Sequence, residues 1–264
     1  MKVAIAQMRY NWSDPISKNL RKALGFVERA GRGGSEIVCF SEYFLGKDAM
    51  LGHPSRGLKT DAALRSIAEM AKESDVAVIC GATRDFRQGQ RKPFVTCPIM
   101  NSKGEIVKKL DKLIIHPREP DWMQPGSGSE IAEIDGFNLG VLSGFDIFIS
   151  SAIQALRKKS IDLLFYQLSA YTRPLLETEQ AAVITRCQEL MIPVVAVGQL
   201  GEFFKRQFLG GSMACVPQIV RFGTSASAGG AKVVKKLGSE ESFEIVELDM
   251  QELMQQRKKI SLYE

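Results

Sequence analysis

The sequence has little of the chemistry that marks a metal centre or a disulfide scaffold. It has only two histidines, His53 and His116, which are few ligands for a histidine-based metal site. No C-x-x-C spacing occurs, and most of the cysteines lie in apolar runs, which favours buried thiols in a reducing compartment. The five cysteines are Cys39, Cys80, Cys97, Cys187 and Cys215. We therefore expect neither a metal nor an organic cofactor.

Long hydrophobic runs and linker segments are also absent. No apolar run approaches the roughly 20 residues that a membrane-spanning helix needs. The stretch at residues 1–6 is too short for a secretory signal and lacks a cleavage region. No linker-like composition or internal repeat divides the 264 residues, which predicts a single domain over residues 1–264. We expect a cytoplasmic protein without a membrane partner.

The chain carries only a small excess of positive charge. The net charge is +5, from 35 basic and 30 acidic residues. The basic residues form short runs such as Lys108-Lys109 and Arg157-Lys158-Lys159, which are more typical of solvated element ends than of phosphate-binding patches. No aromatic-basic RNA-binding motif accompanies them, so we expect no nucleic-acid partner.

The hydrophobic pattern predicts alternating strands and helices at the start of the chain and hairpins further along. This mixture is typical of a layered α/β sandwich rather than a doubly wound sheet. The predicted strands are 2–8, 36–40, 76–82, 94–101, 105–110, 131–134, 138–142, 161–167, 193–198, 212–216, 231–237 and 243–249. The predicted helices are 19–30, 60–73, 147–159, 178–190 and 250–259.

Glycine, proline and polar residues predict loops between these elements. Residues 84–92 and 203–211 are predicted as loops, and residues 43–59, 116–130, 169–178 and 199–211 are candidates for the loops that surround a site. Six aromatic residues in or beside such loops either line a pocket or pack internally. They are Tyr43, Phe44, Trp122, Tyr171, Phe203 and Phe204.

The most informative stretch is residues 137–146, a short apolar strand that runs into the small-residue corner Ser143-Gly144 and then into a helix. Strand-to-helix corners often carry the reacting residue of α/β proteins, because backbone N–H groups and a helix N-terminus face the ligand there. Glycine has no side chain and cannot act as a nucleophile. The corner therefore predicts a site, but Gly144 supplies it with no nucleophilic side chain.

Three polar residues, Glu42, Lys112 and Glu119, fall at predicted strand ends or in adjoining loops. A carboxylate and an ammonium group that share one cleft can act as general base and electrostatic stabiliser for acyl transfer. The same three residues can also form a buried ion-pair cluster whose only role is structural. Spacing alone leaves both interpretations open.

The order of several motifs resembles the nitrilase superfamily of carbon–nitrogen hydrolases, nearly from end to end. Phe40-Ser41-Glu42 is similar to that family's Phe-Pro-Glu, and Leu110-Asp111-Lys112-Leu113 to its Tyr-Arg-Lys segment. Glu119 to Gly126 is similar to its Glu-rich loop, which ends in Phe-Thr-Pro-Gly. Further similar motifs lie at residues 2–8, 186–189, 208–212 and 247–249. The resemblance implies a four-layer α-β-β-α sandwich, with Glu42 as general base, Lys112 as catalytic lysine and Glu119 as second active-site glutamate.

The family's nucleophile motif, Gly-Val-x-x-Cys-Tyr-Asp, reads Gly140-Val141-Leu142-Ser143-Gly144-Phe145-Asp146 in this chain. The alignment of its flanks implies that Gly144 stands at the position of the cysteine. The Phe-Pro-Glu-x-x-Arg that follows in the family is altered as well, to Ile149-Ser150-Ser151 and then Gln154. The departure is local to the site.

Glycine at the nucleophile position would remove the thioester step of the family's mechanism. We therefore expect a homologue that binds a partner, or a small amide, amine or carboxylate ligand, without turnover. One alternative is an active hydrolase of a small amide, carbamoyl or nitrile substrate that uses Ser143 or a water activated by Glu42 and Lys112. Another is a structural subunit that assembles with an active paralogue. Ser143 is a poor substitute for the family's cysteine for two reasons. Successive side chains near a strand end point to opposite sides, and a hydroxyl has a far higher pKa than a thiol.

The resemblance also implies a homodimer. Members of the family pair through the helix after the nucleophile strand and the helix near residues 175–190. Apolar residues that would suit a buried face lie in the first of these segments. They are Ile147, Phe148, Ile149, Ala152, Ile153 and Leu156.

Overall fold

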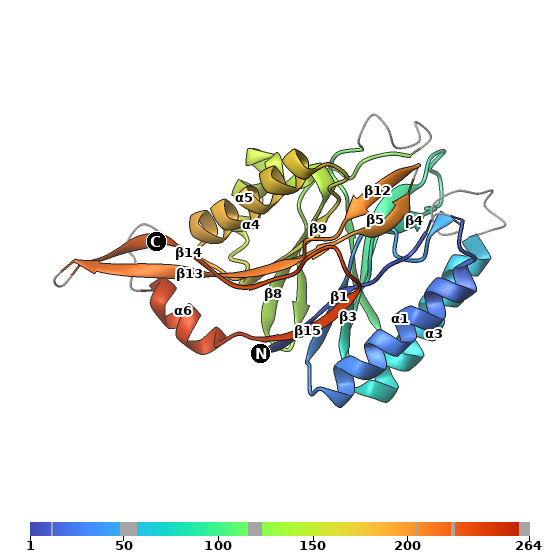
Figure 1. Ribbon diagram of the computed structural model, residues 1–264, viewed down its shortest axis with the longest axis horizontal. Coiled ribbons are helices and arrows are strands. Elements are labelled where there is room, and N and C mark those ends of the chain that lie inside the picture. Colours follow the sequence, from blue (N-terminus) through green and yellow to red (C-terminus); the bar gives the residue numbers. More distant parts are fainter. Residues whose placement is uncertain (12, 48–56, 116–122, 204, 223–224, 259–264) are drawn as a thin grey trace.

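Two mixed β-sheets lie face to face between two layers of helices (Figure 1). The computed structural model describes residues 1–11, 13–47, 57–115, 123–203, 205–222 and 225–258. The arrangement confirms the predicted four-layer α-β-β-α sandwich. None of the helices in this part of the chain is long and apolar enough to cross a membrane.

The first sheet has the strand order β15-β1-β2-β3-β5-β4, with β6 paired to β5. Its strands are β1 (Lys2–Gln7), β2 (Ile37–Phe40), β3 (Ala77–Ile79), β4 (Thr83–Asp85), β5 (Phe94–Met100), β6 (Ile106–Asp111) and β15 (Ser242–Glu247). The parallel strands β1, β2 and β3 are buried on both faces, as their unbroken apolar runs predicted. Ala4 and Ala6 pack under helices α1 (Ile16–Arg32) and α3 (Gly57–Ser74), whereas Val3 and Ile5 face the second sheet.

The second sheet has the strand order β14-β13-β10-β9-β8-β7. Its strands are β7 (Ala132–Ile134), β8 (Phe137–Ser143), β9 (Leu163–Leu168), β10 (Val194–Gly198), β13 (Met213–Phe222) and β14 (Ser225–Lys236). Helices α4 (Ser150–Lys158) and α5 (Arg173–Leu190) cover its outer face, where Leu156 and Val183 pack on Leu164 and Tyr166. The chain ends its described part in α6 (Met250–Lys258).

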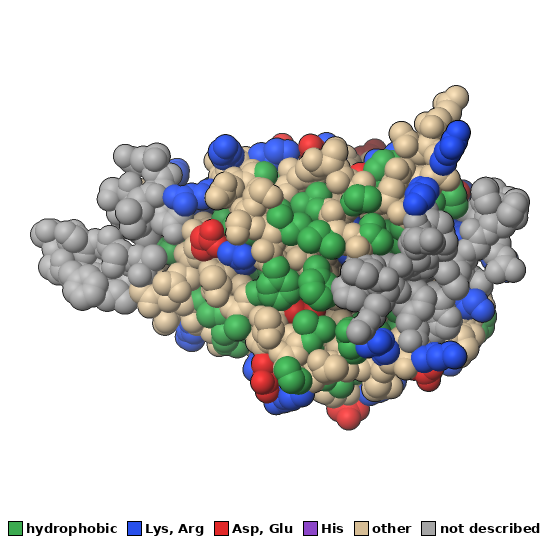
Figure 2. Space-filling view, turned by 90° about the horizontal axis from the view of Figure 1, so that it is seen from above, with side chains coloured by type: hydrophobic (Ala, Val, Ile, Leu, Met, Phe, Trp, Pro, Cys, Tyr) green, Lys and Arg blue, Asp and Glu red, His purple; other side chains and the backbone are tan. Residues whose placement is uncertain are grey.

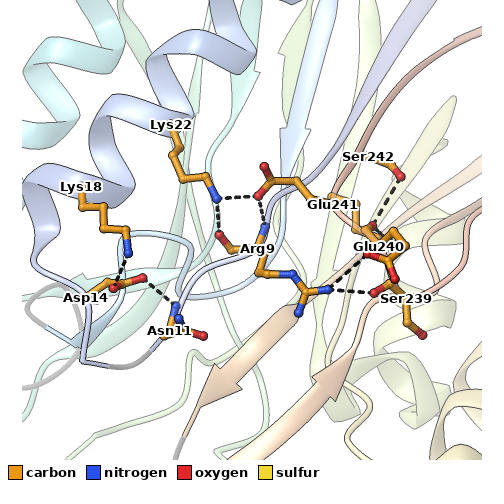
Figure 3. A network of polar contacts seen from close by, with 10 residues as sticks. Arg9, Asn11, Asp14, Lys18, Lys22, Ser239, Glu240, Glu241 and Ser242 are labelled. Carbon is orange, nitrogen blue, oxygen red and sulfur yellow. Dashed lines mark hydrogen bonds and ion pairs between the residues drawn. The ribbon is translucent and has the colours of Figure 1, made fainter.

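A polar network ties the end of β1 to α1 and to the turn before β15 (Figure 3). The Glu241 carboxylate accepts hydrogen bonds from the Arg9 backbone N–H at 2.8 Å and from Lys22 Nζ at 2.5 Å. Lys22 also donates to the Arg9 carbonyl at 2.7 Å, and the Arg9 guanidinium donates to the Ser239 carbonyl at 3.0 Å. Such half-exposed pairs contribute about 1 kcal/mol or less each, so the network mainly fixes the path of the chain.

The structure corrects two predicted loops. Residues 203–211 are not a plain loop, because β11 (Leu200–Phe203) and β12 (Arg206–Leu209) form a hairpin there. Residues 84–92 likewise contain the end of β4, which pairs with β5. Phe203 and Phe208 are buried in the first core cluster, which explains why the short hairpin is stable despite its polar turn.

Two helix predictions were wrong in their bounds. The helix predicted at 147–159 is a 3-10 helix, η2 (Gly144–Phe148), followed by α4, because Ile149 has an extended backbone with φ −86° and ψ 107°. The helix predicted at 178–190 begins earlier, at Arg173, where the Thr172 hydroxyl caps it by accepting from the Leu175 N–H at 3.4 Å.

Candidate active site

Glu42 and Lys112 meet as a buried ion pair between two strand ends of the first sheet. Glu42 follows β2 and Lys112 follows β6, and Lys112 Nζ lies 2.7 Å from Glu42 Oε1. The two side chains are only 3% and 4% exposed, respectively. A buried pair of this kind holds a carboxylate base and a cation in fixed relative positions, which is what acid–base chemistry on a small ligand requires.

The backbone around Glu42 is held tightly in place. The Tyr10 hydroxyl donates a hydrogen bond to the Glu42 carbonyl. A Cβ atom at Gly81 would lie 1.9 Å from the Ser41 carbonyl oxygen, so only glycine allows the chain after β3 to pass this close to the end of β2. The next residue, Tyr43, has a left-handed backbone with φ 54°, which turns the chain away from the strand.

Gly144 lies directly beside this pair. Its backbone is left-handed, with φ +53°, and the Tyr166 hydroxyl donates to its carbonyl at 2.9 Å. A Cβ atom added to residue 144 would lie 3.4 Å from Lys112 Nζ and 3.3 Å from Ser169 Oγ. We call this position the Gly144 gap. A side chain at residue 144 would therefore start beside the lysine of the ion pair.

The Ser143 hydroxyl is engaged in a network between the two sheets. Ser143 is buried, and its Oγ donates to Gln167 Oε1 at 2.7 Å. Gln167 in turn donates to the Cys80 carbonyl at 2.9 Å and to the Phe40 carbonyl at 3.3 Å, both on the first sheet. The serine hydroxyl thus helps to join the two sheets and makes its hydrogen bond to an amide, which is not a base.

Asp146 anchors the chain that follows Lys112 to η2. Its Oδ2 accepts from the Leu113 N–H at 3.0 Å, and its Oδ1 accepts from the Ile114 N–H at 2.8 Å. Burial raises the pKa of Asp146 to about 6, against the opposing influence of these hydrogen bonds and of the Lys112 charge. The position of Lys112 therefore depends on a carboxyl from the Gly144 corner.

An Asp146→Asn variant is expected to lose about 1–3 kcal/mol of unfolding free energy. Leu113 and Ile114 donate to different carboxylate oxygens, and an amide offers an acceptor to only one of them. Urea unfolding measures the change, with the exposed Asp61→Asn as the matched control. Equal stabilities of the two variants would contradict the anchoring role.

Comparison with known proteins assigns the chain to a family. A family model described as carbon-nitrogen hydrolase matches residues 2–234, which is most of the chain. The chain belongs to the carbon–nitrogen hydrolase family.

Among curated members of the carbon–nitrogen hydrolase family and its relatives, similarity is distant. The 2-oxoglutaramate amidase of Bacillus subtilis (strain 168) is 22% identical over 264 residues, which cover 99% of this chain and 96% of that protein. Nitrilase homolog 2 of Dictyostelium discoideum is 22% identical, and the omega-amidase NIT2 of Xenopus tropicalis 23% identical. The matched part spans 50% and 63% of the length of these two relatives.

Solved structures show the same fold. A mutant of the amidase from Nesterenkonia sp. AN1, with the acetamide moiety of fluoroacetamide added to its active-site cysteine, superposes with a TM-score of 0.79. It is 18% identical, and the match covers 97% of this chain and 92% of that one. Another structure of an amidase from Nesterenkonia sp. gives a TM-score of 0.78 at 19% identity, over 98% of this chain and 94% of that one.

This member of the carbon–nitrogen hydrolase family has a further carboxyl near the Gly144 gap that sequence reasoning missed. Glu179, on α5, is fully buried, and its Oε2 accepts from the Ser169 N–H at 2.9 Å. Burial raises the pKa of Glu179 to about 8; the hydrogen bond from the Ser169 N–H and the nearby Tyr166 hydroxyl oppose this shift, and the charge of Glu42 adds to it. In the sequence Glu179 stands between Thr178 and Gln180, so it resembles an exposed helix position.

Some predicted site residues cannot be placed. Glu119, Trp122 and Phe204 lie outside the described residues. Of the other aromatic candidates, Tyr43, Phe44 and Phe203 are buried and pack internally, whereas Tyr171 is partly exposed against Phe208.

The predicted state of the thiols is confirmed, because all five cysteines are free and buried. In the described part of the chain, no three His, Cys, Asp or Glu side chains come together in a group that could hold a metal ion. Among the described residues, the candidate site consists of Glu42, Lys112 and the Gly144 corner.

Proposed function

We propose that this carbon–nitrogen hydrolase family member binds a small amide, amine or carboxylate compound at the Glu42–Lys112 pair without the family's covalent step. The proposal places Gly144 at the nucleophile position. The observation that carries it is the Gly144 gap, because a side chain at residue 144 would begin 3.4 Å from Lys112 Nζ. The position that suits a nucleophile thus lacks the atom that would form the bond.

The retained pair explains why binding remains while covalent catalysis is lost. Covalent acyl transfer needs a nucleophile that a base activates, together with a cation or N–H groups that stabilise the oxyanion. Glu42 and Lys112 supply the base and the cation at 2.7 Å from one another. Both can orient a polar ligand, but residue 144 offers no nucleophile to attack it.

The runner-up is a working hydrolase that uses Ser143 or a water activated by Glu42 and Lys112. The Ser143 hydroxyl donates to Gln167, so it would have to leave this buried hydrogen bond and find a base before it could attack. Direct attack by water needs no such rearrangement, and it is the form of this alternative that the geometry allows more readily.

The unmodified protein is expected to release no ammonia from short amides, carbamoyl-amino acids or nitriles beyond the rate of a Glu42→Ala control. The physical reason is the missing nucleophile at residue 144. Coupled ammonia detection at high enzyme concentration measures the rate. Turnover of any of these compounds above the control would establish the runner-up instead.

A second alternative is a structural subunit that assembles with an active paralogue. Figure 2 shows apolar side chains gathered on the side of the molecule where α4 and α5 lie. Phe148, Ile149 and Ile184 are partly exposed in this layer. We propose that this face joins two copies of the chain in a homodimer, in a cytoplasmic protein with reduced thiols. Exclusive homodimers at micromolar concentration, measured by sedimentation after co-expression with a paralogue, would count against the subunit alternative.

A further inference from the structure

Gln167 lies near the end of β9 and reaches across to the first sheet. It is fully buried, and every hydrogen-bonding group of its amide is used. Its Nε2 donates to the Cys80 carbonyl at 2.9 Å and to the Phe40 carbonyl at 3.3 Å. Its Oε1 accepts from Ser143 Oγ at 2.7 Å and from the Ala82 N–H at 3.2 Å. One side chain of the second sheet thus holds the end of β2 and the chain that follows β3.

These hydrogen bonds fix the backbone on both sides of Glu42. Phe40, whose carbonyl accepts from Gln167, is the last residue of β2 and stands two positions before Glu42. On the other side, the Tyr43 N–H donates to the Ala82 carbonyl at 3.0 Å, and the Ala82 N–H donates to Gln167. The chain before and after Glu42 is therefore tied, directly or through one residue, to the same amide.

The same amide also holds the Gly144 corner. Ser143 directly precedes Gly144, stands opposite Gln167 in the pairing of β8 with β9, and donates its hydroxyl to Gln167. A Cβ atom at residue 144 would lie 3.4 Å from Lys112 Nζ, and Lys112 in turn pairs with Glu42. The separation between Glu42 and residue 144 thus depends on hydrogen bonds that converge on one side chain.

We propose that Gln167 is the positioning residue of this site, which sets the distance between Glu42 on the first sheet and residue 144 on the second. This inference rests on the proposed function, because it takes Glu42 and residue 144 as parts of one site. A glutamine suits the role because it offers two N–H donors and an acceptor oxygen without charge, whereas an ionised glutamate has no donor for the two carbonyls. The Ser143 hydroxyl then joins the corner to Gln167 and does not attack a substrate.

The chain contains a matched control for this role. Gln7, at the end of β1, is also fully buried and also reaches across to the second sheet. Its Oε1 accepts from the Ser212 N–H at 2.8 Å and from Ser212 Oγ at 2.6 Å. Its Nε2 donates to the Gly238 carbonyl at 2.8 Å and to the Glu240 carbonyl at 2.7 Å. Loss of either glutamine amide removes two donated and two accepted hydrogen bonds, but only Gln167 holds parts of the candidate site.

The test measures how fast fluoroacetamide alkylates the Gly144→Cys chain, a reaction in which the introduced sulfur displaces fluoride and Glu42 can take the thiol proton. In this chain, Gln167→Met is expected to slow alkylation about tenfold at neutral pH. It should also move the midpoint of the pH profile upward, because the sulfur lies further from the Lys112 cation. Gln7→Met should leave the rate and the midpoint unchanged, although urea unfolding should show a similar loss of stability for both.

A milder variant, Ser143→Ala, keeps the three hydrogen bonds of Gln167 to the first sheet and removes only its link to the corner. It is expected to slow alkylation of the Gly144→Cys chain about threefold, in a protein with native circular dichroism. Unchanged alkylation in Ser143→Ala would overturn the positioning role. Equal slowing by Gln167→Met and Gln7→Met would overturn it as well, because the effect would then follow from lost stability alone.

Failure of this inference can be told apart from failure of the function on which it rests. If alkylation of the Gly144→Cys chain does not respond to Glu42→Gln, then Glu42 and residue 144 do not form one site, and the proposed function fails together with the inference. If alkylation responds to Glu42→Gln but not to Gln167→Met, the positioning role is wrong and the proposed function stands.

Discussion

Replacement of Gly144 by cysteine is expected to create a thiol that fluoroacetamide alkylates once per chain, while the unmodified protein does not react. The Cβ atom of residue 144 would lie 3.4 Å from Lys112 Nζ, so the introduced sulfur would stand beside a cation and near a carboxylate base. The cation favours the thiolate, which is the reactive form, and the carboxylate can accept the thiol proton.

The native thiols leave the background of this experiment low. All five cysteines are buried, and burial raises the pKa of Cys80 to about 12 and that of Cys215 to about 11. A thiol of ordinary pKa carries about a thousandfold more thiolate at neutral pH than one with a pKa of about 12. Intact-mass spectrometry over time therefore reports on residue 144 alone.

The matched control is Gly136→Cys. Gly136 also has a positive φ, +79°, but it lies exposed in the β7–β8 turn, with open space where its Cβ would stand. Both variants carry a similar left-handed strain of about 1–2 kcal/mol. A Glu42→Gln change should slow labelling of the Gly144→Cys chain about a hundredfold and leave the Gly136→Cys chain unchanged. Labelling at Gly144→Cys that is no faster than at Gly136→Cys, or is indifferent to Glu42, would refute a retained but disarmed site.

The layered fold was predicted from the mixture of alternating strands and helices with hairpins, and its four-layer form from the resemblance to the nitrilase superfamily. The burial of the first strands was predicted from their apolar pattern. Apolar residues without alternation, as in Val3, Ala4 and Ile5, indicate burial on both faces, and the structure buries Val3 against one layer and Ala4 against the other. The strand that leads into Ser143-Gly144 was predicted for the same reason. The order of motifs added the pairing of Glu42 with Lys112, which are 70 residues apart along the chain.

Local pattern could not show features that depend on tertiary packing. The β11–β12 hairpin owes its stability to Phe203 and Phe208, which pack into a core that the flanking polar residues do not reveal. Glu179 occupies a helix position among polar neighbours, yet α5 turns it against the end of β9. Nothing in the sequence around Ser169 marks it as a site residue. It stands out only because its Oγ would lie 3.3 Å from a Cβ atom at residue 144. A single sequence does not show which polar groups of a site are buried by elements from elsewhere in the chain.

The burial of Glu179 predicts a large dependence of stability on pH. Relative to Glu179→Gln, the unmodified protein is expected to lose about 4–5 kcal/mol of unfolding free energy as pH rises from about 4.5 to about 8. The ordinary pKa of this carboxyl is 4.5, and burial raises the pKa to about 8 in the folded chain. Between these values the folded state binds the proton and the unfolded state does not. The stabilisation is thus complete below the unfolded pKa and is lost as pH rises through the folded pKa.

The comparison with Glu179→Gln isolates this carboxyl from its neighbours. Asp146 titrates in an overlapping range, because burial raises its pKa to about 6, and Glu42, Lys112 and Tyr166 lie close enough to influence Glu179. These groups are common to both proteins, so their contributions largely cancel in the difference between the two curves. Glutamine keeps an oxygen that can accept the Ser169 N–H, which limits the change to the titrating proton. Urea unfolding at half-unit steps of pH provides both curves.

The result also decides between two opposed effects at one carboxyl. Burial away from water favours the neutral acid, whereas the hydrogen bond from the Ser169 N–H favours the anion. If burial dominates, the unmodified protein weakens relative to the variant as pH rises. If the hydrogen bond dominates, the two curves run parallel or diverge in the opposite direction, and Glu179 is a carboxylate in the folded protein. An ionised Glu179 would bring a second negative charge near Glu42, and of the proposed ligand classes the site would then favour a cationic amine.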